Sequence, residues 1–242
     1  MIEVESLTVR YGGVTSLDDM SLTFEQGTCG LIGPNGAGKT TFFNVLSGFV
    51  RPAAGTVRAE GTDLLSMAHF RRARWGVRRT FQTEQAIEDL SVFDNVAMVQ
   101  EHSKLGRATR TKDVLDAISF VGLDADPQTP AAKVRTLTVG QRRLVEVARA
   151  VVGRPRLVLL DEPAAGLPDE ETSHLGEVIR AIPEHTGALT ILVDHDMSLV
   201  SACCATTAVL DFGKLIASGP TAAVLRNDDV IRAYLGLAGD TA

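Results

Sequence analysis

Residues 33–40 form a glycine-rich segment, Gly-Pro-Asn-Gly-Ala-Gly-Lys-Thr, that matches the pattern G-x-x-x-x-G-K-[ST] at every fixed position. The glycines allow successive backbone N–H groups to turn inward around phosphate groups. Lys39 supplies a point charge for the β- and γ-phosphates, and the hydroxyl of Thr40 is a ligand for Mg²⁺. A helix that starts near Lys39 adds the positive end of its dipole. The segment therefore predicts a phosphate-binding loop.

The flanking residues give this loop the setting that its chemistry requires. An apolar run at 28–32 predicts a buried strand, and residues 41–47 predict a helix. Strand, glycine loop and helix follow one another in this order in phosphate-binding loops, whereas a chance glycine-rich turn with a surface lysine needs no such order. The residues that we expect to contact the nucleotide are Gly33, Pro34, Asn35, Gly36, Ala37, Gly38, Lys39, Thr40 and Thr41.

The composition limits the kinds of partner. The chain has 242 residues, is 45% hydrophobic and carries a formal net charge of −6, which is enough chain for one large domain or two small ones. An acidic chain is a poor nucleic-acid binder by bulk attraction to phosphate, so we expect no nucleic-acid partner. The densest basic cluster consists of Arg71, Arg72, Arg74, Arg78 and Arg79. We interpret it as a solvated face with strand-edge charge rather than a dedicated contact surface.

Cysteine usage and the first residues indicate the compartment. Cys29, Cys203 and Cys204 have no zinc-type spacing, so we expect buried free thiols in a reducing cytosol. The start, from Met1 to Glu5, lacks the basic and apolar parts of a signal peptide. No run approaches the ~18 apolar residues that a membrane span needs. We predict a cytoplasmic protein whose role at a membrane comes through a partner.

Hydrophobic periodicity indicates alternating strands and helices. Residues 156–161 and 188–194 are apolar without alternation, as expected for buried strands of a parallel sheet. Residues 91–153 repeat apolar positions at intervals of three and four, which predicts a helical block that ends in a helix at 139–152. The other predicted strands are 2–9, 14–24, 28–32, 55–59, 76–81, 206–212 and 214–218, and the other predicted helices are 170–182, 196–202, 220–226 and 228–235. The pattern favours an α/β nucleotide-binding core that carries a helical subdomain.

Two neighbouring carboxylates end the first of these buried strands. Asp161 and Glu162 follow the apolar residues Leu157 to Leu160. An acidic residue at the carboxyl end of a strand points to the crevice where α/β sheets bind ligands. We expect Asp161 to hold Mg²⁺ through water and Glu162 to polarise an attacking water. The alternative is a strand that simply ends in solvent.

A third motif, Leu-Thr-Val-Gly-Gln at 137–141, precedes an amphipathic run. By itself it predicts a helix start with a threonine cap and a permissive glycine. Between the two nucleotide motifs, it is similar to the signature segment of ABC-type ATPases. The resemblance covers essentially the whole chain, with Tyr11 as the adenine-stacking aromatic, 33–40 as Walker A, Gln82 as the Q-loop glutamine, 137–141 as the signature, 157–162 as Walker B and His195 as the switch histidine.

This resemblance implies a fold and a set of roles. The fold is an α/β P-loop core with a parallel sheet, an N-terminal antiparallel β subdomain and an inserted helical subdomain. Residues 1–82 and 154–242 would form the nucleotide-binding core, and residues 83–153 the helical subdomain with the signature helix. ATP and Mg²⁺ are the implied cofactors. The implied catalytic residues are Glu162, His195 and Gln82, and the implied metal site consists of Thr40, Gln82 and Asp161.

ABC ATPases also work as head-to-tail pairs that trap two ATP molecules between two subunits. The resemblance implies that the signature contacts the ATP of the partner subunit through Thr138, Val139, Gly140 and Gln141. The chain departs from the family pattern in three places. Thr138 replaces the usual serine and keeps the hydroxyl, Val139 replaces the first glycine, and Pro168 stands where the family usually has Asp or Asn. Asp169 is the candidate to substitute at the last position.

A finer resemblance concerns the transported class. Residues 79–82, 164–167, 194–197 and 230–236 look like those of ATPase subunits of branched-chain amino acid importers. The implied partners are a second ATPase, identical or different, permease subunits gripped by a groove near 83–95, and a periplasmic-type solute-binding protein. The implied location is the inner face of the cell membrane. Alternatives are importers of urea or short amides, a lipopolysaccharide-type transport ATPase, a non-transport ABC ATPase and a small-molecule kinase.

Overall fold

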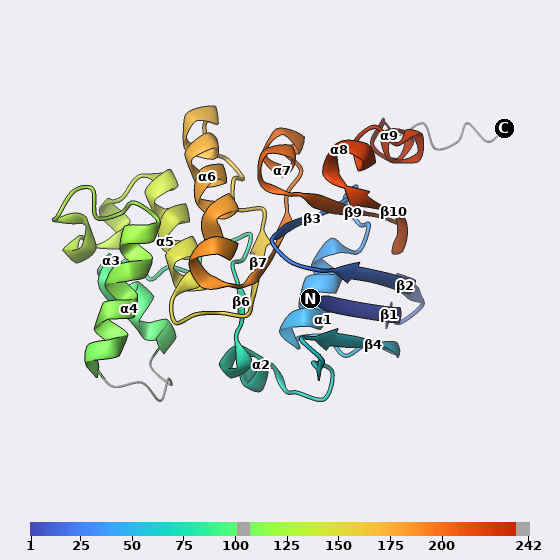
Figure 1. Cartoon of the computed structure of the whole chain (residues 1–242), viewed down its shortest axis with the longest axis horizontal. Helices are drawn as coiled ribbons and strands as arrows, with labels where there is room; N and C mark the ends of the chain where they lie inside the picture. Colours follow the sequence, from blue (N-terminus) through green and yellow to red (C-terminus); the bar gives the residue numbers. More distant parts are fainter. Residues whose placement is uncertain (101–106, 236–242) are drawn as a thin grey trace.

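The structure is a computed structural model that describes residues 1–100 and 107–235, and it contains two β-sheets (Figure 1). One sheet has the strand order β2-β1-β4-β5 and the other β10-β9-β3-β8-β7-β6. The strands are β1 (Ile2–Tyr11), β2 (Val14–Phe24), β3 (Thr28–Ile32), β4 (Ala54–Ala59), β5 (Thr62–Asp63), β6 (Val77–Arg79), β7 (Leu157–Asp161), β8 (Leu189–Val193), β9 (Thr206–Asp211) and β10 (Lys214–Pro220).

The six-stranded sheet is the core of the molecule. Its neighbouring strands from β9 to β6 run parallel, and β10 pairs antiparallel with β9 at one edge. Every residue of β3, β7 and β8 is buried, which explains why these segments are apolar without alternation. Successive side chains of β7 belong to different cores, since Leu157 and Leu159 pack in one apolar cluster and Val158 and Leu160 in the other.

The four-stranded sheet is antiparallel and closes one of these two clusters. β1 pairs with β2 on one side and with β4 on the other. Its alternating side chains explain the alternating sequence, because Ile2, Val4, Leu7 and Val9 are buried while residues between them reach solvent. The hairpin tip places Tyr11 opposite Val14. The N-terminal antiparallel β subdomain implied by the family resemblance is confirmed.

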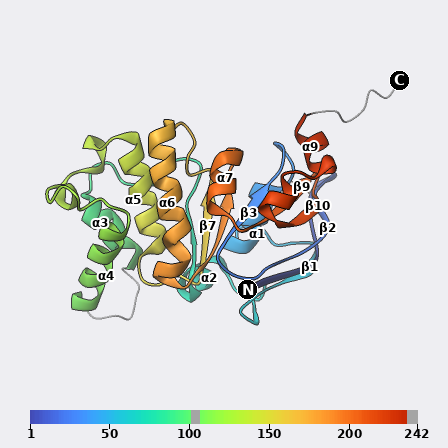
Figure 2. The same ribbon diagram turned by 45° about the horizontal axis from the view of Figure 1, so that its top comes forward.

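Helices pack around the sheets, and some of them gather at one end of the molecule. Their bounds are α1 (Lys39–Ser47), α2 (His69–Trp75), α3 (Val92–Ala97), η1 (Met98–Gln100), α4 (Arg107–Phe120), η2 (Thr129–Ala131), η3 (Val134–Thr136), α5 (Val139–Val151), α6 (Asp169–Thr186), α7 (Met197–Cys203), α8 (Thr221–Val224) and α9 (Asp228–Leu235). Both ribbon views show α3, α4 and α5 together at the end opposite to the four-stranded sheet (Figures 1 and 2). Within residues 1–100 and 107–235, no helix is long and apolar enough to cross a membrane.

Most element boundaries lie within a few residues of those predicted. The predicted helix at 139–152 is α5, which ends at Val151, and the predicted helix at 170–182 is α6, which extends to Thr186. The strand predicted at 76–81 is shorter, because β6 ends at Arg79 and Gln82 lies beyond it. The sequence patterns missed the helix α2 and the two-residue strand β5. Both are too short for periodicity to reveal.

The basic cluster at 71–79 is only in part the solvated face that we predicted, since Arg71 and Arg74 are exposed but two other members are not. The Arg72 side chain is buried and donates hydrogen bonds to the carbonyls of Val45 and Leu46 near the end of α1. Arg79 is likewise buried and pairs with Asp161. The prediction was wrong for these two residues because guanidinium groups can be buried where carbonyl and carboxylate oxygens satisfy their N–H groups.

Candidate functional site

The strand order brings four predicted motifs to one edge of the core sheet. The glycine loop follows β3, Asp161 ends β7, His195 follows β8 and Gln82 follows β6. These strands are neighbours in the order β3-β8-β7-β6 and run parallel, so their carboxyl ends meet. Ligands of open α/β sheets bind at this edge. The convergence therefore identifies the candidate site.

The glycine loop has a backbone that only glycine supports at two positions. Gly33 has φ 148° and Gly38 has φ 106°, both in the region that favours glycine. A Cβ on Gly33 would lie 2.1 Å from the carbonyl oxygen of Leu210, and one on Gly38 would lie 2.7 Å from that of Ser16. These backbone contacts press the loop against β9 and β2. The loop is thus held in shape by its neighbours before any ligand binds.

Lys39 is positioned inside this loop at the start of α1. Its Nζ donates hydrogen bonds to the carbonyl oxygens of Gly33, at 2.5 Å, and Pro34, at 2.9 Å. Burial lowers the pKa of Lys39, and the nearby carboxylates of Glu162 and Asp161 raise it in part. The ammonium therefore faces both the loop and the acidic pair. A phosphate group at the α1 N-terminus would meet this ammonium and the helix dipole together.

Glu162 and Gln82 meet across the site. The Gln82 Nε2 donates a hydrogen bond to Glu162 Oε2 at 2.6 Å. Glu162 has φ 48°, an uncommon left-handed conformation for a residue with a side chain. This conformation turns the chain directly after Asp161, while the Glu162 N–H bonds the carbonyl of Val193 at 2.7 Å. Backbone strain of this kind is frequent at functional sites.

The predicted switch histidine is held by its neighbour. Asp194 Oδ1 accepts hydrogen bonds from the backbone N–H groups of His195, at 2.8 Å, and Asp196, at 3.0 Å. Burial raises the pKa of Asp194, and these hydrogen bonds and His195 lower it in part. The His195 side chain is 70% exposed. The imidazole is therefore open to solvent just beyond the carboxyl end of β8.

Three further predicted contacts lie on the β1–β2 hairpin and in the first turn of α1. Tyr11 is 48% exposed at the tip of the β1–β2 hairpin. That hairpin is tied to α1, because the hydroxyls of Ser16 and Thr41 lie 2.7 Å apart. Thr40 lies in the first turn of α1, and its side chain is exposed. These placements suit the predicted roles of Tyr11, Thr40 and Thr41.

The signature segment lies on a different element from the rest. Thr138 caps α5 by accepting a hydrogen bond from the Gln141 N–H at 3.2 Å, and the Gln141 side chain accepts one from the Thr138 N–H at 3.0 Å. This reciprocal cap confirms the predicted helix start. Val139 is 46% exposed. Gly140 is covered instead, since a Cβ on it would lie 2.6 Å from the carboxyl group of Glu171 in α6.

Sequence reasoning missed several residues that join these parts. Burial raises the pKa of Tyr234 in α9 to about 12, and the nearby backbone of Gly33 lowers it in part. Glu146 of α5 is buried and accepts hydrogen bonds from the Gln85 N–H, at 2.9 Å, and from Arg149, at 3.0 Å. The Glu146–Arg149 pair has the i,i+3 spacing of neighbours on one helix. Spacing could not reveal the contact of Glu146 with Gln85, because the two residues lie 61 positions apart.

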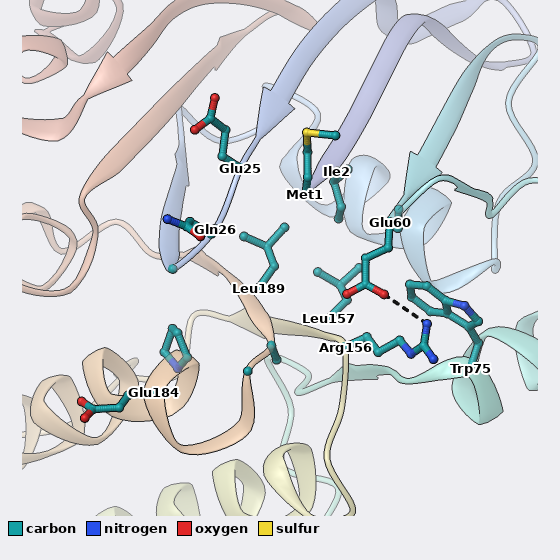
Figure 3. Close-up of a pocket in the computed structure, with 15 residues that line it drawn as sticks. Met1, Ile2, Glu25, Gln26, Glu60, Trp75, Arg156, Leu157, Glu184 and Leu189 are labelled. Carbon is teal, nitrogen blue, oxygen red and sulfur yellow. Dashed lines mark hydrogen bonds and ion pairs between the residues drawn. The ribbon is translucent and has the colours of Figure 1, made fainter.

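Hollows also lie away from the glycine loop. One of about 450 Å³ lies at the opposite ends of the strands, where Arg156 bonds Glu60 at 3.1 Å and its guanidinium lies over the Trp75 ring (Figure 3). It contains none of the predicted site residues. Another hollow, of about 810 Å³, runs between α1, α2, β6 and the segment at 99–100. Exposed rings of Phe49, Phe70 and Phe81 belong to it.

Comparisons with known proteins agree with this geometry. Residues 17–165 match the ABC transporter family, and residues 214–239 match the family described as branched-chain amino acid ATP-binding cassette transporter. The chain is 35% identical to the high-affinity branched-chain amino acid transport ATP-binding protein BraF of Pseudomonas aeruginosa, over 98% of each chain. The chain belongs to the ABC transporter ATPase family. Its activity is therefore ATP hydrolysis, and its fold class is the one predicted.

Solved structures support the fold of this ABC ATPase. The ADP conformation of MJ1267, an ATP-binding cassette of an ABC transporter, superposes with a TM-score of 0.85 at 24% identity and covers 98% of each chain. A dimeric post-hydrolysis state of the cassette MJ0796, bound to ADP and Pi, superposes with a TM-score of 0.78 at 20% identity, over 91% of this chain and 99% of that one. ABC ATPases of this family work as dimers, and these dimers act together with transmembrane components of a transporter.

Proposed function

We propose that this chain is the ATP-hydrolysing motor subunit of an importer for branched-chain or related amino acids. The observation that carries the proposal is the full-length similarity to a branched-chain amino acid transport protein together with the separate match at 214–239. That C-terminal segment includes β10 and the described part of α9, whose Tyr234 lies near the backbone of Gly33. The segment typical of this transporter class thus lies beside the nucleotide loop.

The geometry at the sheet edge supports specific roles for the residues. The loop backbone and Lys39 would bind the phosphates of ATP. Glu162 would take a proton from the attacking water, with Gln82 holding its carboxylate at 2.6 Å. His195 is exposed on its turn and would contact the γ-phosphate. Tyr11 would stack on the adenine.

The residues predicted to hold Mg²⁺ suit such an ion. Thr40, Gln82 and Asp161 offer hydroxyl, amide and carboxylate oxygens, which are the ligands that this hard cation prefers. When bound, Mg²⁺ neutralises charge on the β- and γ-phosphates. The chain contributes a buried carboxylate, because the Asp161 side chain is only 7% exposed. That burial strengthens its attraction for a cation beside the loop.

The exposed signature supports pairing with a second ATPase. Thr138 and the start of α5 form an anion-binding helix end that would clamp the γ-phosphate of ATP held by the partner subunit. ATP would then hold the pair closed, and loss of the γ-phosphate would let it open. Pro168 is the N-cap residue of α6, and Asp169 is the first residue of that helix. A helix therefore begins at the position where the family usually has Asp or Asn.

The aromatic hollow supports contact with a permease. Phe49 is 58% exposed and Phe70 is 48% exposed, and exposed apolar side chains that gather in one hollow commonly mark an interaction site. The groove near 83–95 stays a prediction, and this hollow is lined by residues between 47 and 81 and by 99, 100 and 153. We propose that a helix of the permease docks there, on the cytoplasmic side of the cell membrane.

Affinity purification tests this proposal. Tagged Glu162→Gln protein would be isolated with ATP from native membranes, with wild-type protein and the Lys39→Ala variant as controls, and partners identified by mass spectrometry. We expect permease subunits, a second ATPase and a solute-binding protein, with more partner recovered from Glu162→Gln than from Lys39→Ala. The recovered binding protein would then be screened with branched-chain amino acids by calorimetry.

Other outcomes would redirect the assignment. A solute-binding protein that takes urea or amides would change the substrate class and keep the importer. Recovery of lipopolysaccharide-transport components would make the chain a different transport ATPase. Ribosomal or DNA-associated partners would contradict transport altogether, and a phosphorylated small molecule would indicate a kinase.

A further inference from the structure

Arg79 connects three parts of the molecule through one buried side chain. It lies at the end of β6, three residues before Gln82, and its side chain is 6% exposed. One guanidinium nitrogen donates to Asp161 Oδ2 at 2.8 Å, and the other donates to Asn44 Oδ1 at 2.7 Å. Asn44 belongs to α1, the helix that begins at Lys39. The guanidinium therefore bridges the Walker B strand and the Walker A helix.

Aromatic rings complete the surroundings of this guanidinium. Its central carbon lies 5.4 Å from the centre of the Phe43 ring and 5.0 Å from that of Phe81. Both distances are within the range of cation–π attraction. Phe43 is fully buried in α1, whereas Phe81 is 37% exposed and, like Arg79, lines the aromatic hollow. The same side chain thus touches the wall of the proposed permease groove and the carboxylate of the nucleotide site.

We propose that Arg79 is a positioning residue that orients the Asp161 carboxylate for the metal–nucleotide complex and ties it to Phe81 in the groove. The roles of Asp161 and of the groove rest on the proposed function. Arg79 engages Oδ2 from a fixed direction, because Asn44 and the two rings constrain the planar guanidinium. A carboxylate held in this way keeps one orientation without loss of rotamer entropy when a ligand arrives.

The planar fork distinguishes this role from simple charge balance. A lysine would supply the same charge at a single nitrogen, which cannot bond Asp161 and Asn44 in two fixed directions at once. Arg78 is the natural control, since it carries the same charge on the same strand. It donates to the backbone carbonyls of Ala73 and Val77, and no ion pair links it to a carboxylate in the described part of the chain.

The test compares nucleotide affinity with and without the metal. Dissociation constants of a fluorescent ADP would be measured in Mg²⁺ and in EDTA for wild type, Arg79→Gln, Arg79→Lys and the control Arg78→Gln. We expect Arg79→Gln to reduce the affinity gain from Mg²⁺ about tenfold, as outer-shell changes commonly do, and to leave the constant in EDTA within about twofold. Arg79→Lys would recover only part of the gain, and Arg78→Gln would match wild type.

Two further variants test the links on either side. Phe81→Ala would reduce the Mg²⁺ gain about threefold, in line with a partly exposed cation–π contact. Asn44→Ala leaves the charge in place and removes one anchor, so it serves if Arg79→Gln does not fold, and it should also reduce the Mg²⁺ gain. Thermal melting of each variant would show how much of any effect is loss of fold.

The outcomes separate this proposal from the proposed function. An equal loss of affinity in Mg²⁺ and EDTA would show a merely structural role for Arg79. A larger Mg²⁺ gain in Arg79→Gln would show that the arginine competes with the metal, and an unchanged gain would show that the pair has no role; each overturns the proposal. A wild-type protein that gains nothing from Mg²⁺ would instead count against the proposed ATPase site.

Discussion

The phosphate-binding side and the signature side of this chain are built in different ways. Around the glycine loop, several polar groups are buried or bonded to each other, as in the pairs of Lys39 with Gly33 and of Gln82 with Glu162. At the signature, Thr138 and Val139 are exposed, and within the described residues the Thr138 side chain bonds only in its own helix cap. One side is assembled within the chain, while the other is presented outward.

This difference separates the functions that a single subunit can perform from those that need a second subunit. Nucleotide binding needs a cradle that is rigid before the ligand arrives, and buried hydrogen bonds supply that rigidity. A surface that clamps a ligand on another subunit must remain open to reach it. Variants on the first side should therefore change the behaviour of the isolated chain, and variants on the second side should change only what pairs do.

Loss of Glu162 should have the largest effect. Glu162→Gln removes the base that takes the proton of the attacking water, so steady-state ATP hydrolysis should fall about 100-fold or more. Nucleotide binding should persist, because the loop and Lys39 are untouched. Phosphate release would measure the first quantity and equilibrium dialysis the second. Unchanged turnover would remove Glu162 from the mechanism.

Lys39→Ala should act on binding itself. The variant removes a buried ammonium that faces the loop, and hydrogen bonds to a charged group contribute enough to lower affinity for ATP about tenfold or more. Calorimetry on the isolated chain would measure this change. The control is Lys214→Ala, which removes an exposed lysine paired with Asp18 and should leave affinity unchanged. Equal ATP affinities for the two variants would show that Lys39 does not contribute to nucleotide binding by the isolated chain.

A change at Gly140 should affect pairs and spare the isolated chain. Gly140→Ala puts a methyl group where the Glu171 carboxyl now lies, and this flexible side chain would move into the space in front of the signature. We expect hydrolysis at high protein concentration to fall about tenfold, with ATP affinity of the monomer unchanged. Ser173→Ala is the control, since Ser173 is an exposed residue of α6 outside the signature. Reduced ATP affinity of the Gly140→Ala monomer would contradict the idea that the signature acts only in pairs.

Cysteine reactivity gives the smallest and simplest test of rigidity. Cys29, Cys203 and Cys204 are all buried free thiols, as predicted. Burial raises the pKa of Cys203 to about 11 and also raises those of Cys29 and Cys204, so the reactive thiolate is scarce at pH 8. Mass spectrometry should find no alkylation of the native protein at pH 8 and three modified cysteines after unfolding. Rapid native labelling would show that this core opens.

Local sequence determined the elements and the main motifs. Apolar runs without alternation marked β3, β7 and β8, because strands buried on both faces have no polar side to show. The glycine loop was evident from its spacing, since positive φ angles at Gly33 and Gly38 exclude most other residues. The cap at Thr138 followed from its residue type and the helix after it. These features depend on neighbours along the chain.

Tertiary structure decided which distant residues meet. Arg79 belonged to a cluster that its sequence suggested was solvated, yet it is buried against Asp161, far along the chain, and the contact of Gly140 with Glu171 was equally invisible. Periodicity records which face of an element is apolar, but it does not record the partner that compensates a buried charge. That partner exists only after parallel strands and packed helices bring separate segments together. Local sequence therefore determines the glycine loop for the nucleotide, and tertiary packing decides which side chains hold the carboxylates of the site.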